Sequence, residues 1–326
     1  MSLAGRIAYR DELTRLAQEH PGIVCLEADL GGAKHPFQEA FPDRFFNLGI
    51  AEAAAIDCAT AMAFSGYTPF FSTFAPFAVL RAAESIKLSL GYMVANVKIV
   101  APYAGVAGGW FGTTHHCLED LAVVQAFPGV RILAPYGEEE TREMVRLMAT
   151  TDGPFYMRLG RNGAYASIEG RRDEHGITWQ HEEGRTADSL CVVSVGEMGT
   201  VAALAACEQR SDIVHAHLCQ LDQAALSQAA AVLAGRFRAV LVVEEHRPMG
   251  GIGAALALLM PTCQVYSFNC GQAWPGTGGS HEEVLASLGF SSEALLDRIA
   301  QITAEPLGSA SNQASLTKSE ELTCIS

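Results

Sequence analysis

Apolar runs and helical stretches alternate along most of this 326-residue chain. In the first half, apolar runs that read as strands lie at 22–30, 68–74, 96–105, 130–135 and 154–160. Stretches with helical character separate them, at 51–66, 75–93, 118–127 and 137–151. Strands that alternate with helices of about ten residues or more are typical of a parallel, doubly wound α/β sheet. We therefore predict an α/β domain over residues 1–165.

The same alternation resumes after a polar interval. Residues 166–189 are charged and rich in turn formers, so we expect them to connect two domains. Strand-like and helical stretches then follow at 190–199, 200–209, 212–221, 237–246, 251–260 and 263–269. This pattern predicts a second, smaller α/β domain over 190–305, whereas the Ser/Thr/Glu-rich end at 306–326 reads as a disordered tail.

Composition narrows the class of protein. With 49% hydrophobic and 18% charged residues, the chain suits a globular protein of roughly two domains, and its net charge of −14 argues against a nucleic-acid binder. No apolar run is long enough for a membrane span, and residues 1–20 read as an amphipathic helix instead of a signal peptide. The nine cysteines are scattered without a C-x-x-C pair, so we expect buried thiols in a reducing cytoplasm and no metal site.

One acidic residue stands out in an apolar stretch. Glu52 lies among leucine, isoleucine and alanine, and the nearest charge, Asp57, has the same sign. A buried glutamate without a partner is unfavourable, so such a residue protonates, finds a partner or serves chemistry. The alternative is that Glu52 opens a helix, where a carboxylate complements the N-terminal dipole.

Two further clusters could carry chemistry. Phe74 and Phe77 lie three residues apart at a strand-to-helix junction, which is also compatible with ordinary core packing. The stretch 103–120, YAGVAGGWFGTTHHCLED, is a glycine-rich loop that ends in two histidines. Glycine lets a backbone approach a ligand closely, and histidine can act as an acid or base near neutral pH. The chain has neither a P-loop motif nor a convincing metal-ligand spacing.

These elements together, in this order, resemble the C-terminal half of the transketolase family. The resemblance covers residues 5–300 and is carried by NLGIAE, PFFSTFAPF, RAAESIK, TTHHCLED, GPFYMRLGRNG and VVEEHRPMGGIGAAL. It implies a pyrimidine-binding domain and a C-terminal domain, both doubly wound with mainly parallel sheets. It also implies a transferase that uses thiamine diphosphate to move a two-carbon ketol or related acyl unit.

The resemblance assigns roles to individual residues. The glutamate at the position of Glu52 hydrogen-bonds the aminopyrimidine ring of thiamine diphosphate and drives the tautomer that deprotonates the thiazolium carbon. Phe74 and Phe77 match aromatic residues that stack on the pyrimidine. Asp29 matches an acid near the cofactor and the subunit interface. His115 matches a histidine that contacts the donor's hydroxyl groups.

The substrate side combines one matching residue with several departures. Arg161 matches an arginine that binds substrate phosphate, a task for which a bidentate guanidinium is suited. Phe111 replaces an aspartate that contacts an acceptor hydroxyl, Tyr103 replaces a histidine, and Ala33 replaces a phosphate-binding serine. Because the loss of a buried polar recogniser relaxes substrate choice, we expect transfer to a non-standard acceptor in specialised metabolism.

One half of the cofactor site is missing from this chain. In the family, a G-D-G motif followed by an asparagine binds the diphosphate through a divalent metal, and the chain has no G-D-G. The resemblance therefore implies a split transketolase. A separate N-terminal subunit would carry the diphosphate-binding domain and Mg²⁺, in a heterotetramer with two copies of each chain. Alone, this subunit should be inactive.

Two alternatives to this hypothesis stay open. The β subunit of a 2-oxo acid dehydrogenase has a similar length, an equivalent glutamate and a partner chain, although STFAPFAVLRAAESIK and TTHHCLED look more like transketolase. A non-catalytic scaffold subunit would also fit the fold. It would tolerate Glu52→Gln, whereas an enzyme would not.

Overall fold

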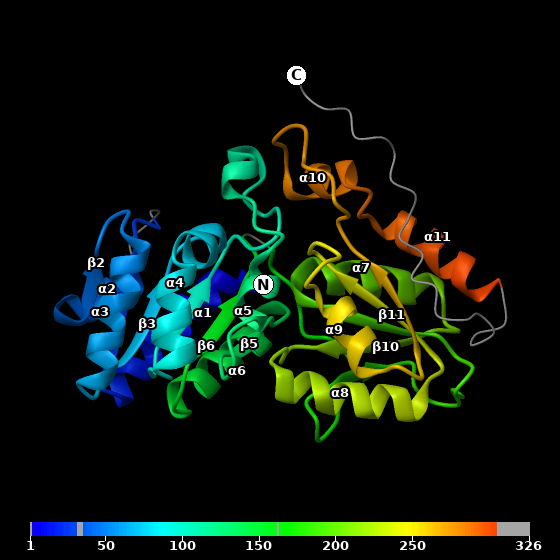
Figure 1. Cartoon of the computed structure of the whole chain (residues 1–326), viewed down its shortest axis with the longest axis horizontal. Helices are drawn as coiled ribbons and strands as arrows, with labels where there is room; N and C mark the ends of the chain where they lie inside the picture. The colour runs from blue at the N-terminus through cyan, green and yellow to red at the C-terminus, as the bar shows by residue number, and fades with distance from the viewer. Residues whose placement is uncertain (1, 31–34, 162, 305–326) are drawn as a thin grey trace.

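Two α/β units lie side by side along the long axis of the molecule (Figure 1). The structure is a computed structural model that describes residues 2–30, 35–161 and 163–304. The expectations for Ala33 and for the tail at 306–326 lie outside these residues. In the described ranges both sheets are mainly parallel, which confirms the predicted fold class of two doubly wound α/β domains.

The first sheet is parallel throughout, with the strand order β2-β1-β3-β4-β6-β5. Its strands are β1 (Ile23–Glu27), β2 (Phe45–Asn47), β3 (Thr68–Ser72), β4 (Lys98–Ala101), β5 (Arg131–Leu133) and β6 (Phe155–Arg158). Every residue of β1, β4 and β6 is buried, which is why these strands appear in the sequence as continuous apolar runs.

Helices cover this sheet and deliver loops to its carboxyl edge. They are α1 (Gly5–Glu19), α2 (Pro36–Ala40), η1 (Pro42–Arg44), α3 (Glu52–Phe64), η4 (Gly109–Phe111), η5 (Thr113–His115), α5 (Asp120–Gln125) and α6 (Gly137–Thr150). The helix expected over 75–93 is not regular. It widens into π-helical turns at η2 (Phe77–Arg81) and η3 (Ile86–Tyr92), on either side of α4 (Ala83–Ser85). Such turns are frequent at functional sites.

The second sheet has the order β12-β11-β9-β10-β8-β7. Its strands are β7 (Arg171–Arg172), β8 (Thr178–Gln180), β9 (Cys191–Val195), β10 (Val214–Leu218), β11 (Ala239–Glu244) and β12 (Gln264–Phe268). Its helices are α7 (Gly196–Gln209), α8 (Gln223–Arg236), α9 (Ile252–Leu259), α10 (His281–Ser287) and α11 (Ser292–Thr303).

The interval expected to be only a connector also adds strands to this sheet. β7 and β8 lie within it and pair antiparallel with each other, and β8 pairs antiparallel with β10. The signal in the sequence is short: Ile177 and Trp179 alternate with polar residues, and each is only 1% exposed. Because the residues around it are mostly charged, this single alternation is too short to predict a strand.

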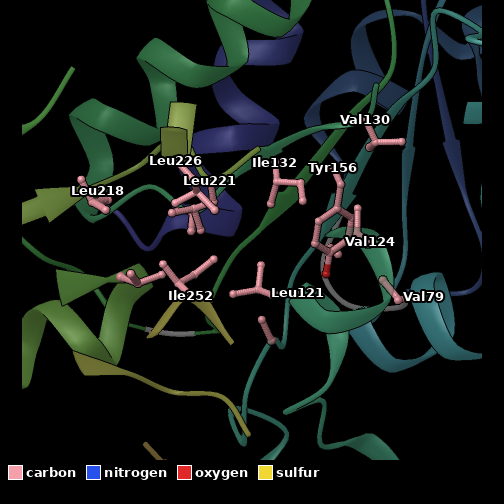
Figure 2. Close-up of a cluster of buried hydrophobic side chains, with 14 of the residues drawn as sticks. Val79, Leu121, Val124, Val130, Ile132, Tyr156, Leu218, Leu221, Leu226 and Ile252 are labelled. Atoms are coloured by element: carbon pink, nitrogen blue, oxygen red, sulfur yellow. The ribbon is translucent and has the colours of Figure 1, made fainter. Parts of the chain in front are cut away.

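One apolar core continues across the two domains. Figure 2 shows Leu121, Ile132 and Tyr156 of the first domain close to Leu221 and Ile252 of the second, and all belong to one buried cluster. Backbone hydrogen bonds reinforce the contact: the Leu221 N–H donates to the Ile132 carbonyl at 2.8 Å, and the Ala134 N–H to the Cys219 carbonyl at 2.8 Å. The domains are therefore joined by shared packing as well as by the chain.

Two expectations from composition can be compared with the described residues. Seven of the cysteines are buried free thiols and Cys58 is an exposed one. Across the described ranges, none of the helices has the length and apolar character required to cross a membrane.

Candidate active site

Side chains from neighbouring strands meet at the carboxyl edge of the first sheet. Phe74 follows β3, Tyr103 follows β4, and Arg161 follows β6. Because β3, β4 and β6 are adjacent and parallel, their carboxyl ends lie together. This edge is where ligands bind in open α/β sheets.

A glycine-rich loop adds two more residues. The loop between Gly105 and Cys117 is closed at its base, where the Gly105 N–H donates to the Cys117 carbonyl at 2.9 Å and the Cys117 N–H returns a bond of 2.6 Å. It projects beside α10 of the second domain (Figure 1). Phe111 and His115 lie on it, in the short helical turns η4 and η5.

These residues form one aromatic cluster. The ring centroids of Phe74 and Tyr103 are 4.2 Å apart, those of Phe77 and His115 are 5.1 Å apart, and those of Phe111 and His115 are 4.9 Å apart. Phe74 and Phe77 meet edge to face at 5.7 Å. The sequence-predicted residues at 74, 77, 103, 111 and 115 are thus brought together.

Two arginines flank this cluster. The guanidinium carbon of Arg161 lies 5.1 Å from the Tyr103 ring centroid and 5.3 Å from that of Phe111. Arg6 approaches the other side, and its Nη1 donates to the Tyr103 hydroxyl at 3.3 Å. The Arg161 Nε is buried without a hydrogen-bond partner among the described residues. A buried donor of this kind is free to donate to an anion.

Arg6 was missed by the sequence interpretation. It lies at the start of α1, 97 positions before Tyr103, and no local pattern marks it. Only the packing of α1 beside the sheet brings it to the carboxyl edge.

Glu52 is the first residue of α3 and is 2% exposed. Its Oε1 forms an ion pair with Nη1 of Arg81 at 2.9 Å. The Arg81 guanidinium also lies 4.4 Å from the Phe77 ring centroid. Glu52 therefore both opens a helix and has a partner, and Arg81 links it to the aromatic cluster.

The ion pair supports a double-mutant prediction for the isolated subunit. We expect Arg81→Met to lower the free energy of unfolding by about 1–3 kcal/mol, because Glu52 would lose its partner in a buried position. In a Glu52→Gln background the same change should cost at least about 1 kcal/mol less. Denaturant unfolding of the two single variants and the double variant measures this coupling, and additive losses would contradict it.

His115 lies in a setting that favours its neutral form. Burial, and then the positive charge of Arg81, lower the pKa of His115 below its ordinary value. Its Nδ1 is 2.9 Å from the Thr114 hydroxyl. A neutral imidazole both donates and accepts a hydrogen bond, which suits contact with hydroxyl groups.

Asp29 lies apart from the aromatic cluster. It follows β1, and its backbone N–H donates to Oδ1 of Asn47 at 3.2 Å. Asp29 and Tyr103 both have left-handed backbones, with φ of 47° and 64°. Non-glycine residues in this conformation cluster at ligand sites, a signal that the sequence does not carry.

The second domain places two carboxylates against this edge, the buried Glu245 and the half-buried Glu197. Burial raises the pKa of Glu197 to about 7, and the negative charge of Glu245 raises it as well. The hydrogen bond from the Gly160 N–H and the charge of His281 act in the opposite direction. For Glu245 itself, burial opposes ionisation, but His281 and Arg158 hold its pKa below the ordinary value. The two neighbouring acids therefore have opposite shifts.

The raised pKa of Glu197 predicts a dependence of stability on pH. Since the folded pKa of about 7 exceeds the ordinary 4.5, its contribution is fully present below pH 4.5 and is lost as the pH rises through 7. Relative to the parent chain, Glu197→Gln should gain up to about 3 kcal/mol of unfolding free energy across this window. Unfolding at a series of pH values tests this, with exposed Glu208→Gln as the control. A constant difference would refute the assignment.

The described residues offer an acid and aromatic rings for a heterocycle, but little for a phosphate-bound metal. Among them, no group of three or more His, Cys, Asp or Glu side chains is placed to hold a metal ion. The carboxyl edge thus presents one buried acid, Glu52, together with the aromatic rings of Phe74 and Phe77.

Fold and site together define a two-domain α/β protein in which a buried acid, an aromatic cluster and arginines share one sheet edge. The family model for the transketolase pyrimidine binding domain matches residues 1–166. The chain belongs to the transketolase family, as a C-terminal subunit of the split type. Members of this family depend on thiamine diphosphate.

Relatives and solved structures agree with this assignment. The putative transketolase C-terminal section of Methanocaldococcus jannaschii is 29% identical over 90% of this chain and 94% of its own. One subunit of the apulose-4-phosphate transketolase of Phocaeicola vulgatus is 32% identical over 77% of this chain and 82% of its own. A solved split gene transketolase, an inactive beta4 tetramer, superposes with a TM-score of 0.78 at 30% identity and covers 94% of this chain and 100% of its own.

Proposed function

We propose that this chain is the pyrimidine-binding subunit of a two-chain, thiamine-diphosphate-dependent transketolase that transfers a two-carbon ketol or related acyl unit. The observation that carries the proposal is the buried Glu52 beside Phe77, linked to it through Arg81. When bound, the cofactor supplies a carbanion at its thiazolium C2. Glu52 holds or shares a proton at a pyrimidine ring nitrogen, while Phe74 and Phe77 orient the ring and exclude water.

Other residues of this chain act on the substrate and on the assembly. His115 exchanges hydrogen bonds with donor hydroxyl groups, Arg161 binds an anionic group, and Arg6 adds a second positive charge. Tyr103 and Phe111 line the side where the acceptor enters. Asp29 lies near the cofactor and the subunit interface.

The diphosphate and its metal belong to a partner chain in this proposal. Because the chain has no G-D-G motif, an N-terminal subunit would supply Mg²⁺ and the diphosphate-binding domain. The name of the M. jannaschii relative, a C-terminal section, and the inactive tetramer of β chains in the solved relative support this division. Two copies of each chain would form the active heterotetramer.

The substrates are anionic but depart from ordinary sugar phosphates. Relatives are named for apulose 4-phosphate and for 6-deoxy-6-sulfo-D-fructose, both with a charged end that Arg161 and Arg6 could bind. Phe111 and Tyr103 present aromatic surface where the family commonly places polar recognition groups. We therefore expect a non-standard acceptor with less need for hydroxyl contacts.

Reconstitution tests the function. The chain is purified alone and with an N-terminal transketolase subunit encoded beside it, and exchange of the thiazolium C2 proton is followed by NMR in the presence of thiamine diphosphate and Mg²⁺. We expect exchange above the solution rate only in the complex. Exchange at the solution rate in every combination would reject the proposal.

A further inference from the structure

The segment that follows β11 contacts the start of the loop that carries Phe111 and His115. Glu245 is 6% exposed, and its Oε1 accepts hydrogen bonds from the Val106 N–H at 2.7 Å and from His281 Nε2 at 2.7 Å. A Cβ on Gly105 would lie 2.1 Å from the Glu245 carboxyl carbon. Only glycine at position 105 therefore permits this approach, and the bond fixes the start of the loop.

Arg247 holds the other end of the same loop. Its backbone N–H donates to the Leu118 carbonyl at 2.9 Å, and its Nε donates to Oε1 of Glu119 at 3.0 Å. Residues 105–119 of the first domain are thus fixed at both ends by one segment of the second domain. The intervening turn rests on the second domain as well, since Gly278 lies against Trp110.

A second carboxylate fixes the backbone beside Arg161. The Gly160 N–H donates to Oε2 of Glu197, at the start of α7, with a separation of 2.5 Å. A Cβ on Gly160 would lie 2.0 Å from that oxygen, so a side chain here would displace the carboxylate. The Tyr103 N–H in turn donates to the Gly160 carbonyl at 3.4 Å.

We infer that Glu245 and Glu197 of the second domain are positioning residues that fix the substrate-side groups of the first domain. Glu245 acts through Val106 on His115 and Phe111, and Glu197 acts through Gly160 on Arg161. The roles of those groups as substrate contacts rest on the proposed function, whereas the positioning itself does not. The second domain thereby has a task in the reaction although it contributes no residue to the aromatic cluster.

Charge strengthens the contact made by Glu245. An ionised carboxylate forms stronger and shorter hydrogen bonds to backbone N–H groups than a neutral acceptor does. His281 beside Glu245 favours the ionised form of that acid, as its lowered pKa indicates. Small displacements of substrate-binding groups lower reaction rates steeply, so a clamp on two loops matters for turnover.

Hydrogen exchange of the full chain, followed by mass spectrometry, tests the positioning directly. We expect Glu245→Met to speed exchange in the peptide spanning 104–117 at least tenfold, and to leave β4 and β9 at the parent rate. Gly160→Ala should instead speed exchange at residue 160 and leave 104–117 unchanged. The two substitutions are therefore expected to speed hydrogen exchange in different parts of the chain.

Matched controls exist on the same domain. Glu208 is exposed on α7, and Gly235 lies in α8 with open space around its Cβ position and an ordinary φ. Glu208→Met and Gly235→Ala should leave hydrogen exchange in the peptide 104–117 and at residue 160 at the parent rate. Parent-like exchange of 104–117 in Glu245→Met would overturn the inference. If Glu245→Met also loosens β9, the isosteric Glu245→Gln decides: faster exchange confined to 104–117 supports the inference, and any other pattern overturns it.

Kinetics of the assembled enzyme distinguish positioning from mere stability. We expect Glu245→Met and Gly160→Ala to raise the substrate KM at least tenfold while C2 proton exchange stays within twofold of the parent complex, because Glu52 lies outside the clamped loops. If C2 proton exchange falls in proportion to turnover, Glu245 and Glu197 do not act as positioning residues for the substrate side. If the parent complex shows no C2 exchange, the proposed function fails, and the hydrogen-exchange result still decides the positioning.

Discussion

Glu52→Gln removes proton exchange at the thiazolium C2 in the assembled enzyme, and we expect a loss of at least about a hundredfold. Glutamine has the shape of glutamate but cannot take up or share a proton at the ring nitrogen. Glu52 is 2% exposed at the first position of α3, so no solvent group stands in for it. NMR of the complex with thiamine diphosphate measures the exchange rate.

Asp57→Asn is the matched control for this variant. Asp57 lies on the same helix and carries the same charge, but it is exposed. Its substitution should leave the exchange rate within twofold of the parent. Equal rates for Glu52→Gln and the parent would mean that Glu52 only opens the helix and pairs with Arg81, as in a scaffold subunit.

Phe111→Asp shifts the acceptor preference toward polyhydroxy aldehydes. We expect kcat/KM for ribose 5-phosphate to rise about tenfold to a hundredfold relative to an apolar aldehyde, because a carboxylate accepts hydrogen bonds from acceptor hydroxyl groups. The ring of Phe111 lies against His115 and Arg161, which are the groups that face the substrate in the proposed function. Competition between the two aldehydes in one reaction measures the shift.

Trp110→Asp controls for charge on the same loop. Trp110 is 75% exposed, and no ring contact joins it to the aromatic cluster in the described part of the chain. It should leave the preference between the two aldehydes unchanged. If the parent enzyme already uses ribose 5-phosphate as efficiently as an ordinary transketolase, the non-standard acceptor is the wrong hypothesis, and Phe111→Asp will show no gain.

Local patterns in the sequence predicted the buried strands of both sheets, but not the short strands β2, β7 and β8. Phe74 and Tyr103 lie at the ends of predicted apolar runs and Arg161 follows one, so their placement at one sheet edge follows from the parallel topology. The pairing of Glu52 with Arg81 did not follow, since 29 residues separate them and the irregular π-helical turn of η2 sets where Arg81 lies.

No local pattern in the sequence predicted the long-range contacts between the two domains. Glu245 reaches Val106 across 139 positions, and Glu197 reaches Gly160 across 37. Both bonds depend on how the second domain docks on the first, and that docking is set by side-chain packing over many residues. The glycines at 105 and 160 were visible in the sequence, but the carboxylates that require them were not.

The core shared by the two domains has a consequence for synthesis in the cell. Ile132 and Leu121 leave the ribosome well before Leu226, which packs in the same cluster. At 5–20 residues per second, the chain between them takes roughly 5–20 s to make. During that interval the apolar face of the first domain is uncovered, so a nascent chain is most prone to aggregate before the second domain has been made.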